Sequence, residues 1–307
     1  MRRILVVILI VMLCGQVAVA QPRKRNANYP PKLDGAKVEV YKTIGDVKLN
    51  MYIFNPKDHK PSDKRPAAVF FFGGGWRSGS PKQFEQHCKY LASRGMVAMA
   101  ADYRVSTRHH TKAKEAVADA KSAIRWIRKE AGRLGIDPDR IVAGGGSAGG
   151  HLAACTGTIS KFDESGEDAA ISSKPNALAL FNPALVLAPI DGRPPLSAET
   201  MKTLAERMGV DPQELSPFHH VAAGVPPTII FHGKADTTVP YATAEQFTKA
   251  MQAAGNRCQL VGYAGQSHGF FNYGRSENKY YIATVRALDK FLVSLGYLQG
   301  KPKIGDE

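Results

Sequence analysis

The sequence has 307 residues, 44% of them hydrophobic and 22% charged. This composition excludes a disordered or fibrous chain, and the length is sufficient for one large hydrophobic core, so we expect a single α/β domain. The formal net charge of +14 would suit a nucleic-acid binder. However, the lysines and arginines are scattered and no RNA- or DNA-binding motif is present, so nucleic acid is not an expected partner.

The first 20 residues have the pattern of a secretory signal peptide. Met1-Arg2-Arg3 is basic, residues 4–13 form a continuous apolar run, and Ala18-Val19-Ala20 is a small-x-small cleavage site. We expect cleavage after Ala20 and export to the periplasm or the medium. No stable membrane anchor is expected, since the apolar run is too short to span a bilayer. Loss of two arginines and no acid lowers the net charge from +14 to +12.

The cysteines are too few for a disulfide framework. Cys14 lies in the signal peptide, and the bulky Leu13 before it argues against a lipidated N-terminus. Cys88, Cys155 and Cys258 each lie in an apolar stretch. We expect three buried thiols, with one bridge plus one free thiol as the alternative.

Beyond the signal peptide we expect a basic arm (21–35), an α/β domain (36–298) and a C-terminal tail (299–307). Apolar runs predict strands at 38–44, 47–54, 67–72, 96–102, 141–144, 177–181, 228–232 and 259–263. Helices are predicted at 80–95, 117–131, 151–155, 197–208, 244–254 and 281–295. This alternation predicts an α/β fold, a three-layer αβα sandwich around a mostly parallel eight-stranded sheet that opens with an antiparallel pair.

A glycine-rich turn at residues 145–150 is the most informative motif. A short apolar strand precedes it, and a small apolar helix follows. Gly-x-Ser-x-Gly in this setting is typical of a nucleophile elbow, which holds Ser147 in strained backbone geometry. Side chains at Gly145 or Gly149 would collide with the crossing backbone. A plain glycine turn is the alternative to a nucleophile elbow. An acid and a histidine at other strand ends would favour the elbow.

Two such residues follow later strands. Asp236 comes after strand 228–232, and His268 comes after strand 259–263. A serine hydroxyl needs an imidazole to accept its proton, and the imidazole needs a carboxylate to fix its tautomer. The carboxyl ends of parallel strands meet at one sheet edge, so we expect Ser147, Asp236 and His268 to form a catalytic triad there. His232 is expected to be structural.

The negative charge that develops during such catalysis needs preorganised N–H donors. The amide of Ala148 supplies one, and glycines after strand 67–72 supply others, because no Cβ blocks the approach of a ligand. The histidines and cysteines lack metal-ligand spacing, and no phosphate-binding loop occurs. We therefore expect neither a metal nor a cofactor.

Together these motifs resemble the α/β-hydrolase superfamily over residues 35–298, in particular the bacterial esterase/lipase branch related to hormone-sensitive lipase and to feruloyl and acetyl-xylan esterases. The resemblance implies that Gly74 and Gly75 form the oxyanion hole and that Asp102-Tyr103-Arg104 supports their loop. Two residues depart from the pattern. Phe72 stands where the motif has histidine, which puts the loop's orientation in question. Gly146 replaces the acidic residue before the nucleophile, which favours the feruloyl and acetyl esterase side.

The resemblance implies a secreted serine carboxylesterase that hydrolyses short-chain, acetyl-like esters of small molecules or carbohydrates. The irregular segment 182–227 is short for a cap, so a fairly open site is expected. Seven lysines and arginines lie in the stretches 57–65 and 108–114, and the arm adds Arg23, Lys24 and Arg25. Solubility alone accounts for such charges, and attraction of an acidic, acetylated polysaccharide is the further hypothesis. The side chains expected to line the site are Trp76, Arg77, Tyr103, Arg104, His151, Asn182, Phe270 and Phe271.

Two other functions share parts of this pattern. A peptidase of the prolyl-oligopeptidase type has the same triad, but such enzymes usually carry a propeller domain, for which this chain has no segment. A hydrolase-fold binding protein without activity would show a broken triad, and all three residues are present. The sequence leaves the oligomeric state open.

Overall fold

The computed structural model describes residues 29–305. Every helix and strand named below belongs to the unit that begins at Pro31. The predicted signal peptide (1–20) and residues 21–28 of the predicted arm lie outside the described residues. Residues 29–36 form neither helix nor strand.

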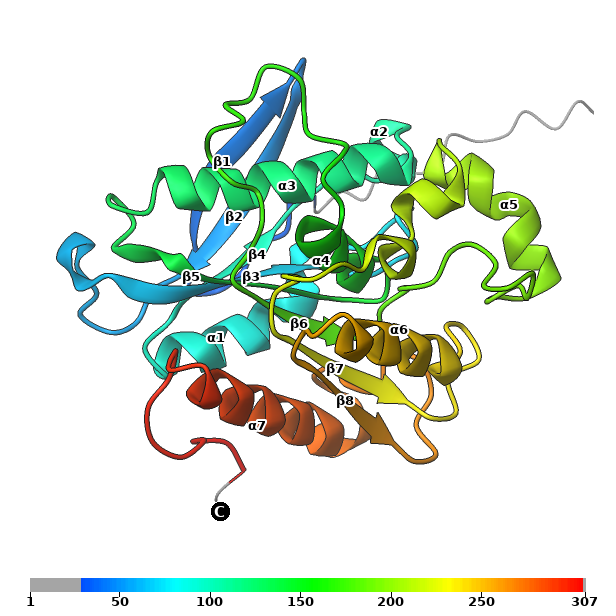
Figure 1. Ribbon diagram of the computed structural model, residues 1–307. Helices are drawn as coiled ribbons and strands as arrows, with labels where there is room; N and C mark the ends of the chain where they lie inside the picture. Colours follow the sequence, from blue (N-terminus) through cyan, green and yellow to red (C-terminus); the bar gives the residue numbers. More distant parts are fainter. Residues whose placement is uncertain (1–28, 306–307) are drawn as a thin grey trace, which may run out of the picture. The chain divides into compact units, whose positions relative to one another are not determined.

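In the described part of the chain, strands and helices alternate as predicted (Figure 1). The strands are β1 (Lys37–Ile44), β2 (Val47–Phe54), β3 (Arg65–Phe71), β4 (Val97–Ala101), β5 (Ile136–Gly146), β6 (Ala177–Phe181), β7 (Thr228–Gly233) and β8 (Cys258–Tyr263). The helices are α1 (Glu85–Ser93), α2 (Ser106–His109), α3 (Ala113–Lys129), α4 (Ala148–Thr158), α5 (Ala198–Met208), α6 (Tyr241–Ala253) and α7 (Lys279–Ser294). Short 3-10 helices are η1 (Pro61–Asp63), η2 (Pro81–Phe84), η3 (Pro212–Leu215), η4 (Pro217–His220) and η5 (Ser276–Asn278).

The strands form one sheet in the order β1-β2-β4-β3-β5-β6-β7-β8. β2 runs antiparallel to β1 and β4, and all other neighbours are parallel. The mostly parallel eight-stranded sheet predicted from the sequence is thereby confirmed. β5 is longer than predicted because it begins at Ile136, which pairs with Arg65 before a register irregularity.

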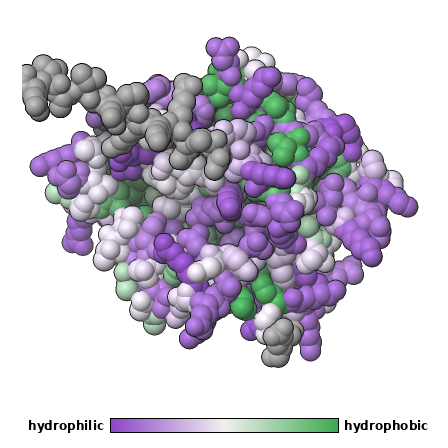
Figure 2. Space-filling view, turned by 180° about the vertical axis from the view of Figure 1, so that it is seen from behind, coloured by the Kyte–Doolittle hydropathy of each residue, from purple (hydrophilic) through white to green (hydrophobic). Residues whose placement is uncertain are grey.

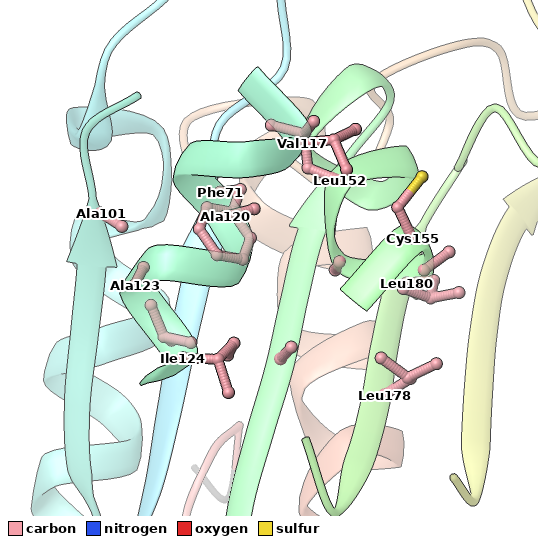
Figure 3. Packing of buried hydrophobic residues seen from close by; sticks show 14 of the residues in the cluster. Phe71, Ala101, Val117, Ala120, Ala123, Ile124, Leu152, Cys155, Leu178 and Leu180 are labelled. Carbon is pink, nitrogen blue, oxygen red and sulfur yellow. The ribbon is translucent and has the colours of Figure 1, made fainter. Parts of the chain in front are cut away.

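Helices cover both faces of the sheet, because successive strand side chains point to opposite sides. Phe71 of β3 packs with Val117 of α3 and Leu152 of α4, whereas the adjacent Phe70 packs in a second cluster with Val285 of α7. Figure 3 shows the first cluster, where α3 and α4 lie against β3, β5 and β6. Helix α6 joins this cluster, and α1 joins the second. The result is the three-layer sandwich expected.

The parallel strands all end at one edge of the sheet, and the turns that follow β3, β5, β6, β7 and β8 meet there. The basic stretch 108–114 lies at this edge, because the amide of Thr107, just before it, donates to the carbonyl of Arg77 in the loop after β3 at 3.0 Å. The stretch 57–65 precedes β3 and lies at the opposite edge, where the Lys64 carbonyl accepts from Arg140 at 2.8 Å. The two basic stretches therefore do not form one surface.

Hydrophilic residues predominate on the surface seen in Figure 2, with hydrophobic ones in small separate groups. Within residues 29–305, no helix is both long enough and apolar enough to cross a membrane. Cys88, Cys155 and Cys258 are free and buried, so the expectation of buried thiols is confirmed and the alternative bridge is absent among the described residues.

Candidate active site

Ser147 occupies the turn between β5 and α4. Its φ of 53° and ψ of −118° form a combination that L-residues rarely adopt. The Ser147 amide donates to the Phe181 carbonyl at 2.9 Å, which ties the turn to β6. A Cβ on Gly149 would overlap the Phe71 carbonyl, as the sequence predicts. The strained turn places Ser147 in the wall of a cavity at the carboxyl edge of the sheet.

His268 connects the serine to a carboxylate. Its Nε2 lies 2.9 Å from Ser147 Oγ, and its Nδ1 lies 2.7 Å from Asp236 Oδ2. When Nδ1 carries the proton and donates to Asp236, Nε2 is free to accept the serine proton. The structure thus brings the three predicted residues, from the ends of three strands, into one chain of hydrogen bonds.

Asp236 is buried and held by its own turn. Its Oδ1 accepts from the amides of Thr238 and Val239, both at 2.9 Å. Burial alone would raise the pKa of this carboxyl, but hydrogen bonds from His232, His268 and the Val239 amide outweigh that effect. They hold the pKa of Asp236 well below its usual range. The carboxylate is therefore ionised at neutral pH, as an acid that orients an imidazole must be.

His232 lies behind Asp236 and is fully buried. Its Nε2 is 2.8 Å from the Val239 carbonyl and 3.3 Å from Asp236 Oδ2. The imidazole closes the turn that presents the carboxylate and does not line the cavity. The structural role expected for His232 agrees with this position.

Asn182, at the end of β6, fixes the loop that carries the histidine. Its backbone amide donates to the Phe231 carbonyl at 2.7 Å, and its side-chain Oδ1 accepts from the Gly269 backbone amide at 2.9 Å. The side chain therefore ties the residue after His268 to the centre of the sheet. Asn182 also lines the cavity.

The glycine loop after β3 lies across the cavity from His268. Gly74 and Gly75 have φ of 124° and 63°, values that favour glycine. The Gly73 amide donates to Gln83 Oε1 at 2.6 Å, whereas the Gly74 and Gly75 amides have no acceptor among residues 29–305. Ala148 begins α4, so its amide also lacks an intrahelical partner. The three residues predicted as oxyanion donors all line the cavity.

Three residues expected to line the cavity are buried beneath it instead. The Tyr103 hydroxyl donates to the Phe72 carbonyl at 2.7 Å, under the glycine loop. His151 accepts from the indole Nε1 of Trp76 at 3.1 Å, and burial lowers the pKa of His151 to about 4. Phe270 packs against aromatic rings of β8 and α7. These side chains shape the site from below and do not reach a substrate.

Arg77 and Arg104 also lie outside the cavity lining. The guanidinium of Arg104 is held by Asp119, with Nη2 at 2.8 Å from Oδ1 and Nε at 2.9 Å from Oδ2. Arg77 is exposed. Sequence proximity to a motif placed both residues in the site, but Arg104 pairs with Asp119 and Arg77 does not line the cavity.

The cavity has a volume of about 420 Å³, and α5 with the segment before it supplies one wall. The segment 182–227 thus supplies one wall of a cavity that is partly open to solvent. Leu204 and Met208, one helical turn apart and buried, mark the inward face of α5, a signal that the sequence carries. Among the expected residues, Trp76, Asn182 and Phe271 line the cavity; the lining residues not foreseen include Gln83, Leu187, Leu196, Thr200, Leu204, Arg207, Thr238, Val239, Asn272 and Arg275.

In the described part of the chain, no group of three or more histidine, cysteine, aspartate or glutamate side chains is placed to hold a metal ion. A serine elbow, an acid and a histidine at the strand ends of a mostly parallel sheet define an α/β hydrolase. Residues 51–251 match the model of the BD-FAE family. The chain belongs to this family of α/β-hydrolase esterases and lipases.

Known relatives agree with this placement. The chain is 30% identical over 240 residues to the probable carboxylic ester hydrolase LipM of Mycobacterium tuberculosis, covering 73% of this chain and 53% of LipM. It is 27% identical over 243 residues to a probable isoprenylcysteine alpha-carbonyl methylesterase, ICMEL1, of Arabidopsis thaliana, covering 72% of this chain and 48% of ICMEL1. The chain thus spans about half the length of the curated relatives it matches.

Solved structures of a thermophilic esterase, Est2 of Thermogutta terrifontis, match over nearly their whole length. Native Est2 is 54% identical, with 90% of this chain and 98% of Est2 covered and a TM-score of 0.85. Est2 structures with bound propionate, with bound butyrate and phosphorylated by paraoxon match as well. The resemblance predicted from the motifs is confirmed.

Proposed function

We propose that the protein is a serine carboxylesterase that hydrolyses short-chain esters through an acyl-enzyme, with Ser147, His268 and Asp236 as its catalytic triad. The observation that carries the proposal is the unbroken chain from Ser147 Oγ through both nitrogens of His268 to Asp236, at 2.9 Å and 2.7 Å. This geometry satisfies the nucleophile–base and base–carboxylate contacts that acyl transfer needs.

In the first half of the reaction, Ser147 Oγ attacks the ester carbonyl carbon while its proton passes to His268 Nε2. The carbonyl oxygen becomes an oxyanion and accepts hydrogen bonds from the amides of Gly74, Gly75 and Ala148. Asp236 stabilises the imidazolium. When the tetrahedral intermediate collapses, the C–O bond to the alcohol breaks, and His268 gives its proton to the departing oxygen.

Water completes the cycle in the second half. His268 Nε2 takes a proton from a water molecule, whose oxygen attacks the acyl carbon and forms a second oxyanion in the same position. Collapse breaks the bond to Ser147 Oγ, which regains its proton from His268. The products are a carboxylic acid and the free enzyme, so no cofactor is consumed.

The cavity supports a small acyl group. Its volume of about 420 Å³ is near the lower end of the range for small-molecule sites, and it must hold both the acyl group and part of the alcohol. Leu187, Leu196 and Leu204 supply apolar contacts, whereas Gln83 and Asn272 supply polar ones. Such a mixture suits acetyl-like esters of polar alcohols, including acylated sugars. The propionate and butyrate bound to Est2 are acids of this size.

We also propose that the protein is exported after cleavage of residues 1–20 and acts in the periplasm or the medium. The motivation is the basic start, the apolar run and the small-residue cleavage site. Intact mass of the exported protein should begin at Gln21. A full-length chain confined to the cytoplasm, or a lipidated Cys14, would contradict this part of the proposal.

Attraction of an acidic polysaccharide remains a hypothesis, now limited to one edge of the sheet. The basic stretch 108–114 lies on the cavity side, whereas the stretch 57–65 lies at the far edge. If the nearby charges steer an acetylated acidic polymer, kcat/KM on that polymer should fall between roughly 0.02 and 0.3 M salt while turnover of a small neutral ester stays constant.

Two measurements test the catalytic proposal. A panel of 4-nitrophenyl acetate, butyrate and octanoate should show efficient hydrolysis of the first two and a steep loss for the third. Paraoxon should inactivate the enzyme and modify the peptide that contains Ser147. Hydrolysis of peptide anilides with no activity on any ester would favour the peptidase alternative, and binding without turnover of any substrate would favour a non-catalytic role.

A further inference from the structure

One arginine in the cavity wall has no carboxylate partner. Arg207 extends from α5 and lines the cavity. Its Nη2 donates to the Gly75 carbonyl at 3.2 Å, and its guanidinium lies 5.4 Å from the centre of the Trp76 ring. Its Nε is buried and has no hydrogen-bond partner among residues 29–305. A guanidinium offers five N–H donors, so much of its capacity is unused.

Among the described residues, other partly buried arginines have acceptors, which are acids for Arg104 and Arg94 and backbone carbonyls for Arg128. Arg104 is paired with Asp119, and Arg94 with Asp289. In the described part of the chain, Arg207 makes no ion pair. A buried N–H donor without an acceptor is unfavourable. An arginine left in that state, in the wall of the cavity that also holds Ser147, is suited to receive its acceptor from the substrate.

The charge around the cavity favours an anion. Arg275 also lines the cavity and donates to the His268 carbonyl at 3.3 Å. No aspartate or glutamate is among the described residues that line the cavity. Burial and the nearby Arg77 both lower the pKa of Arg207, yet a guanidinium stays charged at neutral pH. A negatively charged group entering the cavity meets two cations and no opposing carboxylate there.

We infer that the physiological substrate is an ester that also carries a carboxylate, and that Arg207 binds this carboxylate while Ser147 attacks the ester carbon. The planar guanidinium matches a carboxylate in a two-pronged contact that lysine cannot reproduce. Acylated uronic acids and half-esters of dicarboxylic acids belong to this class. The inference rests on the proposed esterase function and adds the charge of the substrate to it.

A purely structural role for Arg207 makes a different prediction. Its contacts with the Gly75 carbonyl and the Trp76 ring could serve only to hold the oxyanion loop. Loss of such support would lower kcat for every ester by the same factor, because the oxyanion donors act on neutral and charged substrates alike. If Arg207 instead binds an anion, its loss should lower kcat/KM only for the charged ester in a pair of esters that differ in charge alone.

The decisive comparison uses 4-acetoxybenzoate and its methyl ester, which share the acetyl group and the ring and differ in charge. Monoethyl and diethyl succinate form a second pair, with the carboxylate on the acyl side. We expect Arg207→Met to lower kcat/KM for the charged member of at least one pair by about 10- to 100-fold relative to the neutral member. Arg207→Lys should lower kcat/KM for the charged ester less, because lysine keeps the positive charge but lacks the two parallel N–H donors of the guanidinium.

Lys202→Met is the matched control, because Lys202 is an exposed cation on the same helix and does not line the cavity. It should leave both ratios unchanged. Equal losses on the charged and neutral members of both pairs in Arg207→Met would reduce Arg207 to a support of the loop and overturn the inference. Unchanged kinetics on both pairs would overturn it as well.

A binding measurement separates this inference from the esterase proposal. In Ser147→Ala, calorimetry should show that Arg207→Met weakens binding of intact 4-acetoxybenzoate about 10-fold or more while binding of its methyl ester is unchanged. If wild-type protein hydrolysed neither ester, the proposed function would fail while this selectivity could still be measured. If both esters bound alike with and without Arg207, the anion site would be rejected and the esterase proposal would stand.

Discussion

The hydroxyl of Tyr103 donates to the carbonyl of Phe72 at 2.7 Å, and the two rings stack with their centres 4.1 Å apart. Phe72 is the residue before the glycine loop and stands where the motif that this loop resembles has histidine. The stacked rings and the hydrogen bond fix the peptide that leads into Gly73. The loop therefore keeps its support through the tyrosine of the Asp102-Tyr103-Arg104 signature, without a histidine at position 72.

We expect Tyr103→Phe to reduce both stability and activity. The buried Phe72 carbonyl would lose its donor, which costs about 1–3 kcal/mol. A displaced loop would misplace the oxyanion donors and lower kcat by about 10- to 100-fold. Urea unfolding and steady-state kinetics measure the two effects. Tyr281→Phe is the control, because it also removes a hydroxyl bonded to a backbone carbonyl, that of Gln86, but away from the cavity; it should lower stability alone.

Removal of the nucleophile should abolish nearly all turnover. Ser147→Ala should lower kcat on 4-nitrophenyl acetate by about 10⁵- to 10⁶-fold, and His268→Ala by about the same factor, because the two groups act as one unit. The double variant should lose little more than either single one. Near-normal turnover by a folded Ser147→Ala protein would remove the serine mechanism.

Asp236→Asn should lower kcat by about 10⁴-fold, because an amide can donate to His268 Nδ1 and favour the wrong imidazole tautomer. Asp211→Asn is a suitable control. The Asp211 carboxylate caps the short helix η3 by accepting from the Gln213 amide at 2.8 Å, and it does not line the cavity. A loss of this size in Asp211→Asn, with Asp236→Asn remaining active, would show that the acid has been assigned to the wrong residue.

His87 should make stability depend on pH. It is buried among aromatic rings, neither ring nitrogen has a partner in the described part of the chain, and burial lowers its pKa from 6.5 to about 3. Below about pH 6.5 the His87 imidazole therefore binds a proton in the unfolded chain but stays neutral in the folded chain. Stability conferred by the neutral imidazole is present above pH 6.5 and is lost as the pH falls, by up to about 1.4 kcal/mol per pH unit.

Replacement of this imidazole by a phenyl ring tests the effect. The free energy of unfolding of His87→Phe should change less between pH 6.5 and 4 than that of the wild type, because the titrating group is gone and an aromatic ring still fills the space. Denaturant titrations at four or five pH values measure the slope. Parallel pH profiles for the two proteins would show that another group controls acid sensitivity.

Much of the fold follows from local pattern. The strands β3, β4, β6 and β7 are short, mostly apolar runs that are buried on both faces, as Phe70 and Phe71 are. Such runs can be recognised in the sequence because both faces of a parallel sheet are covered. The β1–β2 pair is predictable because apolar and polar residues alternate along both strands. The start of β5 is not, because Ile136 and Arg65 are joined by pairing between distant segments and the intervening Asp137-Pro138-Asp139 reads as a loop.

Residue type and chain order also determined the candidates for catalysis by themselves, because Ser147, Asp236 and His268 each need a particular chemistry at the end of a strand. Which residues line the cavity was decided only by the tertiary structure. Tyr103 and His151 lie near motifs but turn inward, since their polar atoms are satisfied by Phe72 and Trp76. Arg207 lies 60 positions after Ser147 in the sequence, yet it reaches the oxyanion loop, because the direction of a side chain depends on packing against segments that no local pattern specifies.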